Sequence, residues 1–138
     1  MNTTSKRERA RVLVADDFPP FLERIADLLS REFCVVGAVT TGAELVDAVT
    51  SLQPDVVVAD IYMPLMNGLE AAVLIRRRGS QVPIVCMTAH HEQGLLEAVR
   101  NSGALGYVTK AHLAHDLVPA IRAALEGRGF VSGSVSTS

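Results

Sequence analysis

Two kinds of segment alternate along this chain. Short, nearly continuous apolar runs occur at five places, and each run has the length of a buried strand. The stretches between them carry apolar residues every three or four positions, as amphipathic helices do. Because strands that alternate with helices form parallel sheets, the pattern predicts an α/β domain. The predicted strands cover residues 11–15, 33–38, 56–59, 84–88 and 106–109.

The helical stretches have their own start and stop signals. Thr41 precedes one predicted helix and Glu44 follows three residues later, which is the pattern of a capping box. Gly79, Gly103 and Gly127 stand just past three other helix ends, where a left-handed backbone is favourable. These signals support the element boundaries that the periodicity predicts.

Pro119 interrupts the last helical stretch. A proline in a helix interior loses one hydrogen bond and clashes with the preceding turn, which costs about 3 kcal/mol. Asp116 can serve as a helix cap, and Pro119 would then stand in the first turn, where no donor is needed. The regular helix is therefore expected to start near Leu117.

Three acidic residues follow two of the apolar runs. Asp16 and Asp17 come directly after the first predicted strand, and Asp60 comes directly after the third. The expected fold is a flavodoxin-like, doubly wound parallel sheet of five strands in the order 2-1-3-4-5, with helices on both faces. In that order strands 1 and 3 flank the switch point, where ligands bind at the carboxyl ends of the strands. Three carboxylates gathered there repel one another, which predicts a site for a hard divalent cation such as Mg²⁺.

Two further polar residues stand at the ends of later strands. Thr88 ends the fourth predicted strand and Lys110 follows the fifth, so that a hydroxyl and an ammonium join the acids.

Read in order, these motifs resemble the receiver domain of two-component response regulators. The motifs are Asp16-Asp17, the Asp60–Pro64 segment with Asn67-Gly68, Thr88-Ala89, and Gly106-Tyr107 with Lys110. The resemblance covers roughly residues 10–128 and is closest to the NarL/LuxR-type subgroup. It implies a phosphoacceptor that catalyses its own phosphorylation and dephosphorylation and is not otherwise an enzyme.

The resemblance also implies a role for each site residue. Asp60 would accept the phosphoryl group. Asp17, Asp60 and the backbone carbonyl of Tyr62 would bind Mg²⁺ directly, and Asp16 would hold it through water. Thr88 and Lys110 would bind phosphoryl oxygens.

Two pairs of residues are expected to act after phosphorylation. In the family, Thr88 is drawn toward the phosphoryl group and an aromatic residue at the position of Tyr107 turns inward, which makes these two the switch. Tyr62 and His90 lie two residues after Asp60 and Thr88. We hypothesise that these bulky side chains cover the phosphoryl group and tune its lifetime.

Composition limits the partners. With 138 residues and a net charge of −2, the chain fits one domain and has no basic field for nucleic acid, so DNA would be bound only through a separate output domain. No apolar stretch has the length of a membrane span or the form of a signal peptide, so we expect a cytoplasmic protein that does not bind membranes. Cys34 and Cys86 are expected to be buried thiols. The expected organisation is a flexible segment at 1–10, the receiver domain at 11–128, and a tail or linker start at 129–138.

The resemblance implies a sensor histidine kinase or phosphotransfer protein as partner, and a homodimer on phosphorylation. Ala111 stands where many receivers have a cis-proline, and the isomer of the Lys110–Ala111 bond stays open. Rival interpretations are a receiver that works without phosphorylation, a Mg²⁺-dependent phosphatase with an Asp nucleophile, and a flavodoxin-type cofactor binder. The phosphatase is disfavoured by the adjacent acids and the lack of a substrate cap. The cofactor binder is disfavoured because acids after the first strand would repel a phosphate.

Overall fold

The computed structural model describes residues 9–133. Its strands are β1 (Arg11–Ala15), β2 (Cys34–Val39), β3 (Val56–Asp60), β4 (Ile84–Thr88), β5 (Gly106–Thr109) and β6 (Phe130–Val131). Its helices are α1 (Pro19–Leu29), α2 (Gly42–Leu52), α3 (Gly68–Arg77), α4 (Leu95–Asn101) and α5 (Leu113–Leu125), with a 3₁₀ turn, η2 (Lys110–His112), before α5. The predicted strands and the observed ones agree to within one residue.

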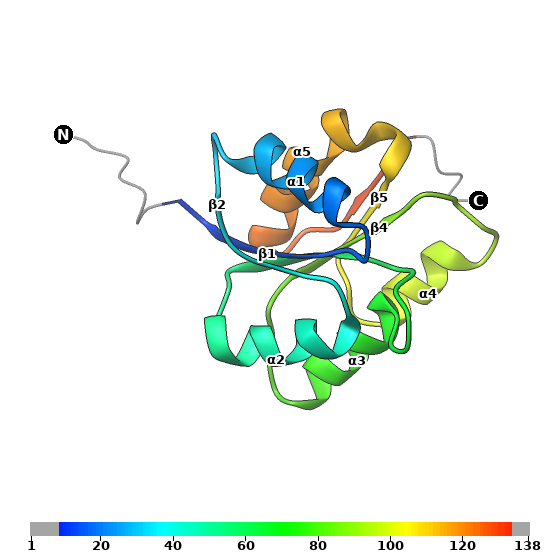
Figure 1. The fold of residues 1–138 in the computed structure, drawn as a ribbon. Coiled ribbons are helices and arrows are strands. Elements are labelled where there is room, and N and C mark those ends of the chain that lie inside the picture. The colour runs from blue at the N-terminus through cyan, green and yellow to red at the C-terminus, as the bar shows by residue number, and fades with distance from the viewer. Residues whose placement is uncertain (1–8, 134–138) are drawn as a thin grey trace.

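All the strands are parallel and form one sheet in the order β2-β1-β3-β4-β5-β6. Helices α1 and α5 cover one face of the sheet, and α2, α3 and α4 cover the other (Figure 1). Each face has its own apolar core, because successive side chains of a strand point to opposite sides. Val12 and Val14 pack on the side of α1 and α5, for example, whereas Leu13 and Ala15 pack on the side of α2. The predicted doubly wound fold is confirmed.

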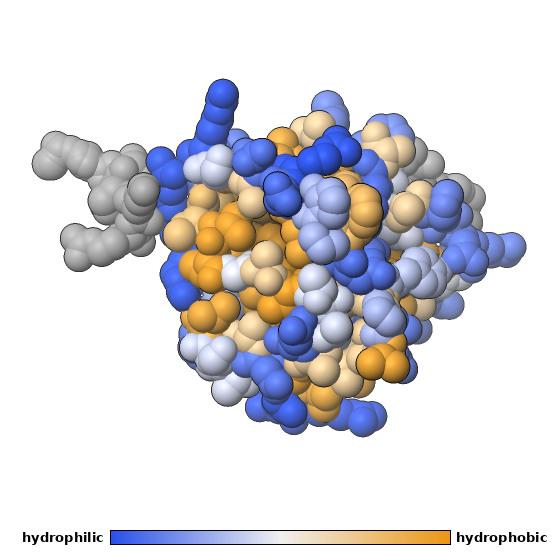
Figure 2. Space-filling view, viewed as in Figure 1, coloured by the Kyte–Doolittle hydropathy of each residue, from blue (hydrophilic) through white to orange (hydrophobic). Residues whose placement is uncertain are grey.

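Strand β2 forms one edge of the sheet. Its residues are half-buried, apart from one exposed position, whereas β3 and β4 are buried throughout. Figure 2 shows hydrophobic side chains gathered on this side of the molecule, between α1 and α2. Strands β1 and β3, at whose ends the acidic residues stand, lie inside the sheet rather than at its edges.

The helix ends follow the sequence signals closely. The Thr41 hydroxyl accepts a hydrogen bond from the Glu44 amide and caps α2. The expected left-handed backbone is found at each of the predicted glycines, with φ of 92° at Gly79, 92° at Gly103 and 78° at Gly127.

A sixth strand was not predicted. Residues 130 and 131, which the sequence placed in a tail, pair with Gly106 and Tyr107 of β5. Two residues are too few to carry a period, so the sequence gives no strand signal here. The strand forms because Val131 packs against the core that includes Tyr107, while Phe130 packs against the core on the other face.

The prediction for the last helix was wrong. Helix α5 starts at Leu113, not near Leu117, and Pro119 lies inside it. Burial explains the difference, because Leu113 is only 6% exposed and joins the same core as Leu117. The burial of one additional leucine by this earlier turn offsets the cost of an interior proline.

Other expectations have clear outcomes. The Lys110–Ala111 bond is trans, because no cis peptide bond occurs in the described part of the chain. Both cysteines are free thiols, but only Cys86 is fully buried and Cys34 is half-buried. None of the helices within residues 9–133 has the length and apolar character that a membrane span requires.

The interior proline gives a stability prediction. Pro119→Ala should raise the free energy of unfolding by about 2 kcal/mol, because it restores a donor for the His115 carbonyl and removes the ring clash at an exposed position. Pro20→Ala is the matched control. Pro20 is also exposed but stands in the first turn of α1, so this change should lower stability by about 0.5 kcal/mol. Urea unfolding monitored by circular dichroism measures both, and a loss of stability in Pro119→Ala would contradict the account.

Candidate functional site

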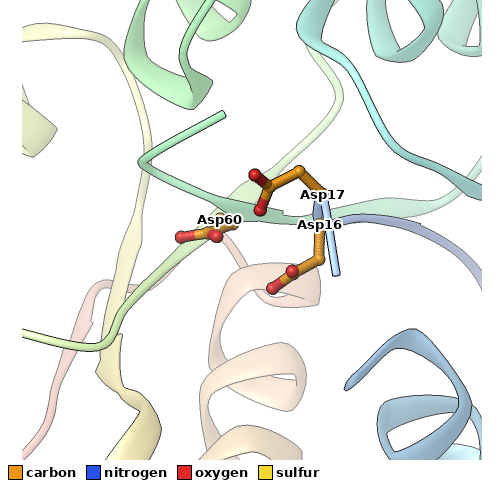
Figure 3. A group of neighbouring side chains, drawn as sticks. All are labelled: Asp16, Asp17 and Asp60. Carbon is orange, nitrogen blue, oxygen red and sulfur yellow. The ribbon is translucent and has the colours of Figure 1, made fainter. Parts of the chain in front are cut away.

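Three carboxylates meet at the carboxyl edge of the sheet. Asp16 and Asp17 leave the end of β1, and Asp60 is the last residue of the adjacent β3. One carboxylate oxygen of each lies within 4.8 Å of the others. Figure 3 shows the three side chains grouped where these two strands end. Asp16 and Asp60 are buried and Asp17 is exposed, so the cluster opens to solvent on one side.

Lys110 brings positive charge to this cluster, although it lies 50 residues after Asp60 in the sequence. Its Nζ donates to Asp16 Oδ2 at 2.6 Å and to Asp60 Oδ2 at 3.2 Å. The ammonium also lies 4.2 Å from the centre of the Phe21 ring on α1, a cation–π distance. Because Lys110 follows β5 directly, the parallel sheet places it on the same edge as the acids.

The charges within the cluster are not balanced. The ion pairs that these acids make inside residues 9–133 both come from Lys110, which leaves an excess of negative charge. Burial raises the pKa of Asp60, and the negative charge of Asp16 raises it further. Lys110 lowers this pKa only in part, so the net shift is upward. Lys110 by itself therefore does not fully stabilise the ionised form of Asp60.

The donor set fits a hard divalent cation. Every candidate ligand is an oxygen, two of the three carboxylates are buried, and the excess negative charge would be neutralised by a cation of charge +2. A softer metal that prefers sulfur or imidazole has no such ligands among the three clustered residues. The residues thus match the chemistry of Mg²⁺.

The loop after β3 is held close to the site by two neighbouring residues. Asn67 caps α3 with a full capping box, in which its side chain accepts from the Glu70 amide and Glu70 accepts from the Asn67 amide. A Cβ at Gly68 would lie 2.3 Å from the Asp60 carbonyl oxygen, so only glycine allows this approach. The Asn-Gly pair thus forms the start of α3.

Thr88 lies at the same edge but faces another partner. It is buried, and its hydroxyl donates to the His90 carbonyl at 2.9 Å and accepts from the His90 amide at 3.3 Å. The hydroxyl thus closes a small turn at the start of the loop between β4 and α4. In this structure Thr88 orders that loop.

Tyr107 is buried beneath the same loop. It is 1% exposed, and its hydroxyl lies 2.6 Å from Nδ1 of His91. Burial, with smaller contributions from the charges of neighbouring groups, raises the pKa of Tyr107 to about 12, so its hydroxyl stays protonated and can donate to this nitrogen. In this structure the Tyr107 side chain is turned inward.

Tyr62 and His90, the two residues expected to cover the phosphoryl group, have different surroundings in the structure. The Tyr62 amide donates to Asp60 Oδ1 at 3.3 Å, and its hydroxyl donates to the Glu92 carboxylate in the β4–α4 loop. This bond to Glu92, together with slight burial, raises the pKa of Tyr62. His90 is exposed, and its backbone carbonyl and amide both bond the Thr88 hydroxyl.

Sequence reasoning found the polar residues at the strand ends but missed their partners. Phe21, His91 and Glu92 contact Lys110, Tyr107 and Tyr62, respectively, and none was assigned a role in the site. Phe21 reads as an ordinary apolar position of a helix, and residues 91 and 92 lie in a loop without periodicity. No sequence signal distinguishes these three residues.

Comparison with known proteins agrees with this geometry. A family model described as response regulator receiver domain matches residues 12–122. The transcriptional regulatory protein PdtaR of Mycobacterium tuberculosis is 35% identical over 116 residues, which are 83% of this chain and 56% of PdtaR. The nitrate/nitrite response regulator protein NarL of Escherichia coli is 31% identical over 135 residues, which are 96% of this chain and 62% of NarL. The chain thus spans somewhat more than half the length of these relatives.

Solved structures show the same likeness. A two-component response regulator of the LuxR family from Aurantimonas sp. SI85-9A1 superposes with a TM-score of 0.87 at 32% identity, over 91% of each chain. The isolated REC domain of RcsB from Salmonella enterica serovar Typhimurium, solved with a phosphomimetic BeF₃⁻, gives 0.83 at 27% identity, over 92% of this chain and 96% of that one. From the match over residues 12–122, the fold and these relatives, the chain belongs to the receiver domain family of two-component response regulators.

Proposed function

We propose that this chain accepts a phosphoryl group on Asp60, in the cytoplasm, from a phosphohistidine of a sensor histidine kinase or a phosphotransfer protein. The observation that carries the proposal is the cluster of three acids with Lys110 bonded to two of them, in a chain of the receiver family. The chain is then a phosphoacceptor that assists its own phosphorylation and dephosphorylation, and not an enzyme that acts on separate substrates.

The proposed phosphoryl transfer needs little help from a general acid or a general base. One carboxylate oxygen of Asp60 attacks phosphorus while the bond between phosphorus and the donor's imidazole nitrogen breaks, and the nitrogen keeps the electron pair and takes up a proton. In hydrolysis a water attacks phosphorus, the bond to the carboxylate oxygen breaks, and Asp60 is regenerated with release of phosphate. Both steps depend on positioning and on neutralising the phosphoryl oxygens.

Each residue of the site has a part in that neutralisation. Asp17, Asp60 and the Tyr62 backbone carbonyl would hold Mg²⁺ directly, and Asp16 would hold it through water. When bound, the ion neutralises negative charge on the phosphoryl oxygens. Lys110, which bonds the Asp60 carboxylate, needs only a small movement to bond a phosphoryl oxygen.

The switch follows from the contacts of Thr88. To bond a phosphoryl oxygen, its hydroxyl must leave the His90 carbonyl, which loosens the turn that begins the β4–α4 loop. His91 in that loop bonds Tyr107, so the movement changes the surroundings of the buried tyrosine. The surface formed by α4, β5 and α5 then changes its affinity for a partner, such as a second copy of the chain or a DNA-binding output domain.

The first prediction concerns the phosphoacceptor. Incubation with acetyl phosphate and Mg²⁺ should add one phosphoryl group to the protein, as measured by intact mass, because Lys110 and a cation held by the acids would neutralise the group transferred to Asp60. Asp60→Asn should show no such adduct, and omission of Mg²⁺ should abolish it in the parent protein. A folded parent protein that takes up no phosphoryl group would favour the alternative, a receiver that binds its partner without phosphorylation.

The second prediction concerns the metal. At a Mg²⁺ concentration about ten times the dissociation constant, the free energy of unfolding should rise by about 1.4 kcal/mol, because only the folded chain gathers the three carboxylates. Asp17→Asn should remove most of this increment. Asp47→Asn, at an exposed acid of α2 that pairs with Arg78, should retain it. Equal increments in both variants would rule out binding at the acid cluster.

The third prediction concerns the lifetime of the phosphoryl group. Replacement of Tyr62 and His90 together by Ala should shorten it several-fold, because both bulky side chains hinder the approach of water. Leu125→Ala, an exposed apolar residue on α5, serves as the control and should leave the lifetime unchanged. The decay of the adduct after removal of the phosphodonor measures the lifetime. An unchanged decay in the double variant would exclude this role.

A further inference from the structure

The segment after α5 returns to the sheet, and alternate residues of it bond to β5 and to the residue just before β5. The Phe130 amide donates to the Leu105 carbonyl at 3.2 Å, and the Ser132 amide donates to the Tyr107 carbonyl at 2.9 Å. The next bond departs from the backbone pattern, because the Thr109 amide donates to the Ser132 hydroxyl at 3.0 Å. A side chain therefore takes the place of the carbonyl that would continue the sheet.

This hydroxyl belongs to a buried polar cluster outside the acid cluster. Its members, Thr109, Asp116 and Ser132, are 7%, 6% and 1% exposed. Burial by itself raises the pKa of Asp116, but hydrogen bonds from His115 and Ser132 outweigh it and the net shift is downward. Ser132 is thus connected both to the end of β5 and to the first turns of α5.

The end of β5 matters because Lys110 follows it. Thr109 is the residue immediately before Lys110, and its amide is the group that Ser132 holds. Lys110 in turn bonds the buried carboxylates of Asp16 and Asp60. Loss of the bond between the Thr109 amide and the Ser132 hydroxyl would remove a restraint on the backbone immediately before Lys110, and this backbone would shift. The long Lys110 side chain would transmit that shift to the acids.

We propose that Ser132 is a positioning residue for Lys110, so that the chain segment after α5 adjusts the site at which Asp60 is phosphorylated. The inference rests on the proposed function of Asp60. The coupling is reciprocal. Movement of Lys110 toward a phosphoryl oxygen alters the bond between Thr109 and Ser132, and so changes how the segment after α5 is held against the sheet.

The test compares two buried serines. Ser132→Ala should slow the Mg²⁺-dependent formation of the acetyl phosphate adduct about three- to tenfold, the effect of roughly one hydrogen bond on a reaction barrier. Ser102→Ala is the matched control, because Ser102 is also buried and its hydroxyl bonds a backbone carbonyl, that of Val99, but it lies at the end of α4. This control should lose stability without losing adduct rate.

A second measurement separates positioning from stability. The NMR signal of the Lys110 ammonium should shift in Ser132→Ala and stay in place in Ser102→Ala, while thermal unfolding shows that both variants are folded. An unchanged adduct rate in Ser132→Ala, or equal slowing in both variants, would overturn the proposal. If the parent protein forms no adduct, the proposed function fails, and the ammonium signal alone then decides whether Ser132 positions Lys110.

Discussion

Mutual repulsion of three carboxylates at one edge of the sheet is the constraint on which this site depends. Asp16, Asp17 and Asp60 gather there because β1 and β3 are adjacent and parallel, and two of them are buried. Lys110 neutralises only part of their charge, and the pKa of Asp60 stays raised mainly because of burial. The fold thus holds a group of acids that favours the arrival of positive charge, which is what a metal-assisted phosphoacceptor needs.

The β4–α4 loop connects this cluster to the rest of the molecule. Thr88 bonds the backbone of His90, His91 bonds Tyr107, and Glu92 accepts from Tyr62. Three consecutive loop residues are therefore bonded to three different strands or strand ends. The contacts of this loop thus lie between the end of β4, the buried Tyr107 of β5 and the residues that follow Asp60.

The residues of the site differ in how well their place in it can be predicted from the sequence. The acids and Lys110 stand next to apolar runs, and a parallel sheet brings the ends of such runs together, so both their identity and their proximity could be inferred. No comparable rule predicts the direction in which a side chain points. Thr88 is expected to bond a phosphoryl oxygen once one is present. In this structure its hydroxyl bonds the His90 carbonyl, and that contact depends on loop coordinates that no periodicity encodes.

The sequence by itself determined the order of the elements, the doubly wound sheet, and the edge where the chemistry is expected, because hydrophobic period and residue type at strand ends are local properties. Tertiary structure alone decided that α5 begins at Leu113, that Phe130 and Val131 form a sixth strand, and which residues bond the polar side chains. These features arise from burial against residues distant in the chain. Core packing against the sheet extended α5 ahead of Pro119, and packing against β5 made a strand from two residues that carry no strand signal.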